Sequence, residues 1–534
     1  MVTTILLFSS LAVFACVFAG RISDRIGLPS LLIFILLGMV FGEDGLLRIP
    51  FSNYGISETI CSVGLIFIMF YGGFGTRWAQ AKSIAVKAIT LSTAGTVLTA
   101  IFIALLCRYV LHFTLMEGLL IGAVLCSTDA ASVFSVLRSR RLNLKENTAS
   151  LLEVESGSND PFSYMLTFLV LSQMADPLGA GETVLLLVKQ IGFGLGIGAV
   201  SGLIALLILK RYPFSNSGIR MCFVMGIAVF SYAFASFVDG NGYLSTYLCG
   251  ILLGNSDYRE RIPLVHFFNG ITGLMQIMIF FLLGFLATPS VFGQIWTSGL
   301  LIFLGLTFIA RPLAVFLLLG PQRSSLGQMG LVSWSGLRGA ASIVFAIMAT
   351  LGDQGLSIDV FHITFFVVLL SITFQGSLLP WAAKKLKLID DSQNVLTTFS
   401  DYADDENVQF LKISITKDHP WLGRTISSLT LPPQTLAALI IRHGQNIAPE
   451  GKTVLEENDT LVLTAPEVED NVLFTLREVT LPENSPWVGK TVAQYGKKQA
   501  GLIIQIRRGE DSLMPRGDTV LATGDTLIIH LDNM

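Results

Sequence analysis

The sequence predicts an all-α polytopic membrane domain followed by small α/β domains. Only 14% of its 534 residues are charged, whereas charged residues make up about 25% of an average soluble domain. Hydrophobic residues account for 52%, and they gather in blocks of roughly 17 to 27 residues, which is the length that a helix needs to cross a hydrocarbon core of about 30 Å. Composition and block length together exclude a soluble protein.

The apolar blocks predict about thirteen transmembrane helices. In chain order they are Thr4–Ala19, Pro29–Phe41, Ile56–Tyr71, Ala85–Val110, Glu117–Leu137, Thr148–Leu171, Glu182–Leu209, Cys222–Val238, Tyr243–Leu253, Phe267–Leu286, Trp296–Leu319, Leu326–Leu351 and Val360–Leu379.

The distribution of basic residues predicts the orientation, because short loops rich in Lys and Arg stay on the cytoplasmic side. Alternate loops are basic, for example at Arg140 and Lys145 and at Lys210 and Arg211, while the loops between them carry almost no basic residues. We therefore expect a multi-pass protein of the plasma (bacterial inner) membrane, with its amino terminus outside and its tail in the cytoplasm. A net charge of -3 and the absence of a basic aromatic module argue against a nucleic-acid partner.

The tail after the last apolar block contains an internal repeat. Pro420-Trp421-Leu422-Gly423 recurs as Pro486-Trp487-Val488-Gly489, and alternating apolar residues between Gly and Pro predict short strands joined by turns. We expect a transmembrane domain over 1–385, a linker over 386–408 and two modules over 409–470 and 474–534. Both modules resemble the carboxyl-terminal half of RCK domains, which regulate potassium conductance.

The resemblance to RCK domains implies a regulatory tail and, in some members, a small anionic ligand. Candidate contacts for an anion or nucleotide are Arg442, His443, Arg507 and Arg508. Ordinary solvated charges on a hairpin are the alternative explanation. No tail segment combines a strand, a Gly-rich turn and a helix, so we predict neither the nucleotide-binding half of the domain nor any bound cofactor.

Three of the apolar blocks carry polar residues near the centre of the membrane, where ionisable groups are costly and therefore indicate function. Ser127-Thr128-Asp129 divides the fifth block, and short polar side chains favour local unwinding because they compete for backbone hydrogen bonds. The sixth block contains Glu153-Val154-Glu155-Ser156-Gly157-Ser158-Asn159-Asp160-Pro161, in which Ser156 and Asp160 share one helix face. Glu155 and Asn159 form the neighbouring stripe.

The twelfth block contains Arg338 within Ser333-Trp334-Ser335-Gly336-Leu337-Arg338-Gly339. Because an unpaired guanidinium is prohibitively costly in hydrocarbon, we expect a buried pair with a carboxylate of the sixth block. The fifth and twelfth blocks also run in opposite directions, and each is interrupted at its middle. Paired interrupted spans of this kind are typical of inverted-repeat transporters with a site at the midplane.

The segments STDAAS, ESGSNDP and GLRGA resemble the signatures of NhaP-type monovalent cation:proton antiporters, over about residues 1–385. The resemblance implies that Asp160 carries either the cation, K⁺ or Na⁺, or the proton. It further implies cation ligands at Thr128 and Ser156, with Asn159 bridging helices and Asp129 orienting the ends of the broken helix. A structural ion pair of Glu155 with Arg338 and a homodimer are implied as well.

A single exchangeable carboxylate predicts electroneutral exchange, because Asp160 cannot bind a proton and a cation at once. The RCK-like tail favours exchange of cytoplasmic K⁺ for external H⁺, with Na⁺ or mixed Na⁺ and NH₄⁺ transport as the alternative. A ligand-gated channel is less favoured, since no filter sequence resembling TVGYG is present. Glu153 lies on the same helix face as Asp160. Two roles are open for it: it lines an entrance funnel to Asp160, or it is a solvated charge at the membrane interface. The alternative for the whole cluster is a purely structural polar contact between helices.

Overall fold

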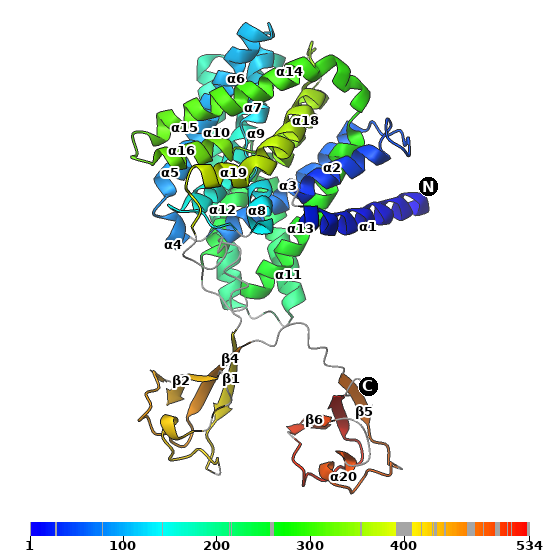
Figure 1. The fold of residues 1–534 in the computed structure, drawn as a ribbon, viewed down its shortest axis with the longest axis vertical. Helices are drawn as coiled ribbons and strands as arrows, with labels where there is room; N and C mark the ends of the chain where they lie inside the picture. The colour runs from blue at the N-terminus through cyan, green and yellow to red at the C-terminus, as the bar shows by residue number, and fades with distance from the viewer. Residues whose placement is uncertain are drawn as a thin grey trace. The chain divides into compact units, whose positions relative to one another are not determined.

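The computed structural model describes most of the chain, divided into a unit over 1–405 and a unit over 406–534 (Figure 1). The described residues are 2–26, 29–76, 78–140, 142–212, 214, 216–256, 261–352, 355–390, 408–417, 419–429, 431, 435–442, 445–466, 476–483, 485–496, 502–509, 511–513 and 515–530. Most of the predicted linker, residues 391–407, lies outside them, and residues 386–390 belong to the helical unit.

The first unit is built from helices. They are α1 (Val2–Ile26), α2 (Ser30–Phe41), α3 (Tyr54–Gly75), α4 (Trp78–Ala81), α5 (Ala85–Thr90), α6 (Thr96–Val110), α7 (Leu115–Leu125), α8 (Ala130–Ser139), α9 (Thr148–Ala175), α10 (Ala180–Arg211), α11 (Ser217–Phe237), α12 (Gly242–Gly254), α13 (Arg261–Leu286), α14 (Phe292–Gly305), α15 (Arg311–Leu319), α16 (Leu326–Trp334), α17 (Ala340–Leu351), α18 (Val360–Leu370) and α19 (Ser377–Lys385). Short π-helical segments join α5 to α6, α14 to α15 and α18 to α19.

Every predicted apolar block coincides with one of these helices or with a consecutive group of them. By length and composition, seven described helices are long and apolar enough to cross a membrane, and the bent pair α7 and α8 raises the number to eight. Four further apolar helices are shorter, including α2 and α12. The helical membrane architecture is thus confirmed, and the figure of thirteen spans stays a prediction.

Both predicted interruptions are present as helix breaks. The axes of α7 and α8 differ by 42° across Cys126–Asp129, and residues 335–339 separate α16 from α17. In contrast, α9 continues through Pro161. Apart from Leu337, the break residues are small or polar, so their backbone groups find partners on neighbouring helices more readily than those of bulky apolar residues.

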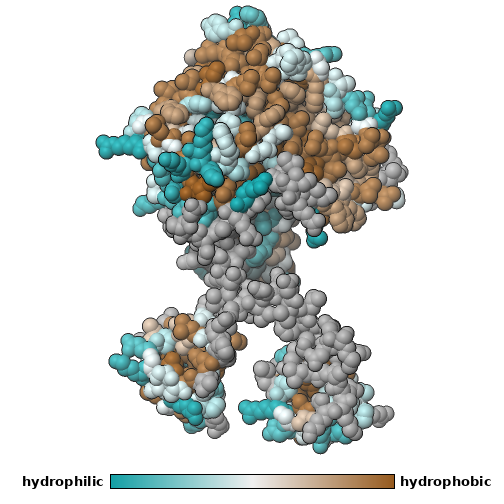
Figure 2. All heavy atoms as spheres, in the orientation of Figure 1, coloured by the Kyte–Doolittle hydropathy of each residue, from teal (hydrophilic) through white to brown (hydrophobic). Residues whose placement is uncertain are grey.

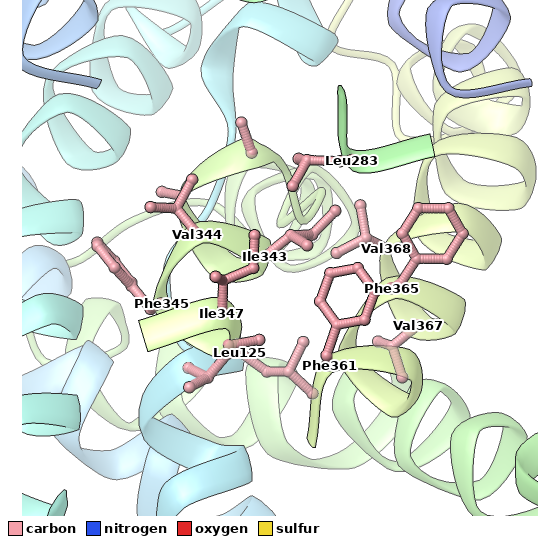
Figure 3. Packing of buried hydrophobic residues seen from close by; sticks show 14 of the residues in the cluster. Leu125, Leu283, Ile343, Val344, Phe345, Ile347, Phe361, Phe365, Val367 and Val368 are labelled. Atoms are coloured by element: carbon pink, nitrogen blue, oxygen red, sulfur yellow. The ribbon is translucent and has the colours of Figure 1, made fainter. Parts of the chain in front are cut away.

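Large apolar side chains fill the space between the helices around α17 and α18. Figure 3 shows Ile343 and Ile347 of α17 facing Phe361 and Phe365 of α18, with Leu125 of α7 beside them, and all five are buried. The outer surface of this unit is also largely apolar: Figure 2 shows hydrophobic residues spread over its visible face, and exposed examples are Phe18, Leu207 and Phe308. An apolar surface around an apolar core is typical of a protein solvated by lipid.

The second unit consists of two modules with the same topology. The first holds β1 (Val408–Ser414), β2 (Leu436–Arg442), β3 (Gln445–Ile447) and β4 (Thr460–Pro466); the second holds β5 (Leu476–Thr480), α20 (Val492–Gly496), β6 (Leu502–Arg508), β7 (Asp511–Leu513) and β8 (Thr526–His530). Their antiparallel sheets have the strand orders β1-β4-β2-β3 and β5-β8-β6-β7. Equivalent bridges, Thr425 to Val454 and Thr491 to Val520, close both modules. The structure therefore confirms the predicted duplication.

The chain leaves α19 along the loop between α8 and α9. The backbone amide of Lys145 donates to the carbonyl of Leu388 at 2.8 Å, and the amide of Asp390 donates to the carbonyl of Asn143 at 3.0 Å. These bonds form a short antiparallel bridge between Leu144 and Ile389. The start of the linker is thus fixed to the loop that joins the two elements carrying the predicted site.

Candidate functional site: a carboxylate at two helix breaks

The break between α7 and α8 leaves backbone groups without helical partners, and α9 supplies several of the replacements. The Ser156 hydroxyl donates to the carbonyl of Thr128 at 2.7 Å and accepts from the amide of Ala130 at 2.8 Å. The Asn159 side-chain amide donates to Oγ1 of Thr128 at 2.6 Å, and its oxygen accepts from the Thr128 amide at 3.4 Å. Two side chains one turn apart therefore hold the unwound segment against α9.

Asp160 follows Asn159 directly and lies at the same break. Its Oδ1 accepts a hydrogen bond from the hydroxyl of Ser127, and its side chain is 7% exposed. The Ser127 hydroxyl with the Asp160 carboxylate, and the Ser156 hydroxyl with the Thr128 carbonyl, thus form two oxygen pairs about one turn of α9 apart at the same break. Oxygen ligands are the ones that hard cations prefer, so the arrangement suits either a proton on Asp160 or a small cation beside it.

Ser127 is a member of this cluster that the sequence analysis did not single out. Its signal was present, because it belongs to the same polar triplet as Thr128 and Asp129. The choice among three adjacent polar residues depends on which of them faces α9 after the helix unwinds, and helical spacing does not determine that.

Asp129 caps the second half of the broken span. Its carboxylate accepts from the amide of Ala131 at 3.0 Å and from the hydroxyl of Ser132 at 2.5 Å, which satisfies donors at the start of α8. The geometry agrees with the expected role of Asp129 in orienting a helix end.

The two breaks touch each other. The amide of Asp129 donates to the carbonyl of Leu337 at 2.8 Å. A Cβ added to Gly339 would lie only 2.4 Å from the Cβ of Asp129, so this approach requires glycine. The unwound parts of both spans therefore cross directly beside α9, as expected for paired interrupted helices with a common site.

Arg338 is completely buried and interacts with the first break. Its Nη1 donates to the carbonyl of Ser127 at 2.6 Å, and its backbone amide donates to the hydroxyl of Ser371 at 3.1 Å. A positive charge thus neutralises the carbonyl end of α7, which carries the negative end of the helix dipole.

The predicted ion pair of Glu155 with Arg338 is not the one formed. Nη2 of Arg311 lies 2.5 Å from Oε1 of Glu155, and both side chains are almost fully buried. Arg311 begins α15, directly after a π-helical segment, and its Nε would lie 3.0 Å from a Cβ at Gly336. Glu155 is therefore neutralised from α15, which leaves Arg338 available for the broken helix.

Arg311 is a second residue near the breaks that the sequence analysis did not single out. It lies within the eleventh apolar block, where an ionisable residue indicates function by the criterion applied to the other blocks. The partner assignment went wrong because two arginines were candidates for one carboxylate, and only the packing of α15 against α16 places Arg311 nearer.

Glu153 begins the approach to Asp160 from the Thr148 end of α9. It lies on the same face, seven residues earlier, and is partly exposed, whereas Asp160 is buried. This position agrees with either of the two roles expected for Glu153.

In the tail modules, two of the predicted anion contacts are structural. Arg442 forms a two-pronged pair with the buried Asp459, with Nε to Oδ1 and Nη2 to Oδ2 both at 2.8 Å. Arg508 pairs in the same way with the buried Asp525, at 2.7 and 2.8 Å. The expectation of an anion contact is corrected for both, because their donors are directed at an internal carboxylate.

The other two tail candidates differ from this pair. Arg507 is exposed, with its Nη2 3.9 Å from Oε1 of Glu478, and His443 lies outside the described residues. Hydrogen bonds from Arg508 hold the pKa of Asp525 below its usual value. This carboxylate therefore stays ionised in the folded module.

Comparison with known families and relatives agrees with the fold. Residues 10–385 match the sodium/hydrogen exchanger transmembrane family, and residues 410–469 and 476–530 match the TrkA-C domain. The chain is 32% identical over 481 residues to the K(+)/H(+) antiporter NhaP2 of Shewanella sp. (strain MR-4), covering 89% of this chain and 83% of that protein. It is also 32% identical over 452 residues to the K(+)/H(+) antiporter NhaP of Alkalimonas amylolytica, covering 83% and 78%.

More distant similarities extend the comparison. The Na(+)/H(+) antiporter ApNhaP of Aphanothece halophytica is 26% identical over 387 residues, which is 68% of this chain and 70% of that protein. The structure of the sodium proton antiporter MjNhaP1 from Methanocaldococcus jannaschii superposes with a TM-score of 0.64 at 23% identity, covering 70% of this chain and 99% of that one. With the transmembrane family model spanning more than half its length, the chain belongs to the sodium/hydrogen exchanger family of membrane antiporters and carries two TrkA-C domains.

Proposed function

We propose that this protein exchanges cytoplasmic K⁺ for external H⁺ at Asp160, one for one, by alternating access. The observation that carries the proposal is the burial of this carboxylate at the contact of two broken helices, among hydroxyl and carbonyl oxygens of Ser127, Thr128 and Ser156. The single negative charge of this carboxylate is compensated by either one proton or one monovalent cation. Obligatory exchange follows, because proton and cation compete for the same oxygens.

Charge counting around the breaks supports electroneutral exchange. The ionisable groups there are the buried Arg311 and Arg338, with two positive charges, and the buried Glu155 and Asp160 with the partly exposed Asp129, with three negative charges when all are ionised. The sum is -1 for the empty site and zero with either a proton or a monovalent cation on Asp160. Because buried net charge is costly, the site should switch between its inward-facing and outward-facing states more easily when Asp160 carries a proton or a cation than when it is empty.

The choice of K⁺ rests on the relatives and on the tail. The K(+)/H(+) antiporters of Shewanella and Alkalimonas share both the membrane part and the tail with this chain. A Na⁺ antiporter is the second candidate, and the similarity to the Na(+)/H(+) antiporter of Aphanothece halophytica favours it. The family consists of transporters, so we propose no enzymatic activity.

We further propose a homodimer in the bacterial inner membrane, with the amino terminus outside and the tail in the cytoplasm. The basic loops after α8 and α10 support this orientation. The TrkA-C domains would bind a small anionic or nucleotide regulator, for which Arg507 and His443 remain the candidate contacts.

Purified full-length protein in proteoliposomes with an internal pH dye tests the function. K⁺, Na⁺, Li⁺, Rb⁺ and NH₄⁺ are added in turn, and each transported cation should change the pH of the lumen in the direction set by its concentration gradient. K⁺ should give the highest ratio of maximal rate to KM. Unchanged rates with valinomycin-clamped membrane potentials of either sign would agree with electroneutrality. Cation flux that moves no protons would indicate a channel instead and would contradict the proposal.

A further inference from the structure

The approach to Asp160 from the Thr148 end of α9 is interrupted by one aromatic side chain. Glu153 and Gly157 lie on the Asp160 face of α9, at the start of the helix and one turn before Asp160, and both are partly exposed. Helices surround α9, among them α5, α7, α10, α12 and α17, so this exposure is not contact with lipid. The exposure ends at Asp160, which is 7% exposed.

Tyr247 of α12 lies where the exposure ends. It is 5% exposed, and a Cβ added to Gly157 would lie 3.0 Å from Cε2 of its ring. Glycine at this position therefore lets the ring lie flat against α9. A larger residue would push the ring away from the path between Glu153 and Asp160.

The hydroxyl of Tyr247 is held in place from two helices. Ser158 of α9 donates to it at 3.2 Å, and it also hydrogen-bonds with Thr76 at the end of α3. The Thr76 hydroxyl donates to the carbonyl of Gly72 at 2.8 Å, so its oxygen is free to accept from the tyrosine. The tyrosine oxygen is thus fixed at Ser158, which lies between Glu153 and Asp160 along α9.

We propose that Tyr247 is a positioning residue for transport: its ring closes the passage from Glu153 to Asp160, and its hydroxyl replaces a water molecule of the cation that passes. The inference rests on the proposed role of Asp160. A phenolic oxygen held by Ser158, with its ring against Gly157, offers a lone pair to a cation that moves along this face of α9 toward Asp160. Removing the hydroxyl should then weaken cation binding from the cytoplasmic face. The alternating-access step that moves the loaded Asp160 site across the membrane should remain unchanged.

Everted membrane vesicles, which expose the cytoplasmic face, allow a direct test with Tyr247→Phe in the full-length chain. This variant keeps the ring and removes one neutral hydrogen-bonding group, so KM for K⁺ should rise about three- to tenfold. The maximal rate at saturating K⁺ should stay within about twofold of the parent, because the carboxylate is unchanged. An unchanged KM would overturn the proposal.

The matched control is Tyr243→Phe. Tyr243 is also buried on α12, four residues earlier, and its ring packs against Tyr164 with centroids 5.0 Å apart. Tyr164 follows Asp160 by one turn on α9, whereas Tyr247 contacts Gly157 before it, so KM for K⁺ should remain at the parental value. An equal rise of KM in both variants would show a general effect of losing a buried hydroxyl and would contradict the specific role of Tyr247.

A second variant keeps the inference testable if Tyr247→Phe does not fold. Ser158→Ala removes the donor that fixes the tyrosine hydroxyl, and it should raise KM in the same direction by a smaller factor. In the double variant the two effects should not multiply, because both act through one hydrogen bond. Independent, multiplying effects would contradict the proposal. The proposed function has a separate test, because it is contradicted if the variant Asp160→Asn still exchanges cations for protons. That result does not depend on the behaviour of Tyr247→Phe.

Discussion

The buried pair of Glu155 and Arg311 determines how charge is distributed around the site. Nη2 and Oε1 are 2.5 Å apart inside a unit where neither group reaches water. Arg338 lies nearby and binds the carbonyl of Ser127 instead. Each arginine therefore has a separate partner, and removal of either leaves a different group uncompensated.

Truncation of one partner tests this assignment. Arg311→Ala leaves the Glu155 charge buried and unpaired, which should cost about 3–5 kcal/mol of stability. Glu155→Gln together with Arg311→Gln removes both charges and should recover a large part of that loss. Thermal unfolding of the purified variants, followed by size-exclusion chromatography, measures the difference.

The comparison with Arg338 decides between the two arginines. If Glu155 pairs with Arg311, the coupling energy in a double-mutant cycle should be larger for Glu155 and Arg311 than for Glu155 and Arg338. A larger coupling with Arg338 would restore the ion pair expected from the sequence and contradict the observed geometry.

At the scale of elements, the contact of the two helix breaks depends on Gly339. Its missing side chain lets Asp129 approach so closely that an added Cβ would be 2.4 Å from Cβ of Asp129. Gly339→Ala should therefore push the broken helices apart, cost about 1–3 kcal/mol or more by overpacking, and strongly reduce exchange in proteoliposomes. Gly226→Ala in α11 is the control, because no atom lies within 4 Å of its added Cβ. Equal activity of both variants would contradict a functional contact.

A different element-scale prediction concerns the second tail module. Hydrogen bonds from Arg508 lower the pKa of Asp525 relative to its unfolded value. The pair therefore contributes stability that is present above the unfolded pKa, near pH 4, and is lost as the pH falls through the lower folded pKa. The protection of the β6 and β8 amides against hydrogen exchange, expressed relative to the intrinsic exchange rate at each pH, should decrease over that acidic range in the full-length protein. The variant Asp525→Asn should exchange faster at neutral pH and lose this pH dependence; an unchanged dependence would assign it to other groups.

The elements were more predictable from the sequence than their contacts. The apolar blocks located the helices, and the triplet at Ser127 and the segment around Gly336 located both breaks, because these signals are local. The partner of Glu155 and the contact of Asp129 with Gly339 arise from helices that are distant in the sequence. The structural role of Arg442 and Arg508 was missed for the same reason, since Asp459 and Asp525 reach them only once the sheet has formed.

At the scale of the whole molecule, the connection between the membrane unit and the tail begins at a defined point. The bridge between Leu144 and Ile389 fixes residues 388–390 to the loop that joins α8 to α9. A chain truncated after Asp390 keeps this bridge, and a chain truncated after Lys387 loses it. We expect the longer truncation product to exchange cations at the parental rate but with an altered pH or ligand response.

The shorter truncation product should show an additional loss of exchange rate or thermal stability, because the loop before α9 loses two backbone hydrogen bonds. Proteoliposome rates and unfolding temperatures of both products, compared with the full chain, measure the two contributions. Identical behaviour of the two products would indicate that the bridge has no mechanical role. An unaltered pH and ligand response in both would contradict control by the tail.

The competition between the proton and the cation for Asp160 is measured most directly as proton release on cation binding. Purified protein in weakly buffered detergent solution, titrated with K⁺ while a pH dye and a binding signal are recorded together, should release up to one proton for each cation bound. Asp160→Asn should abolish the release. Cation binding without proton release in the parent protein, or an unchanged release in Asp160→Asn, would contradict the account.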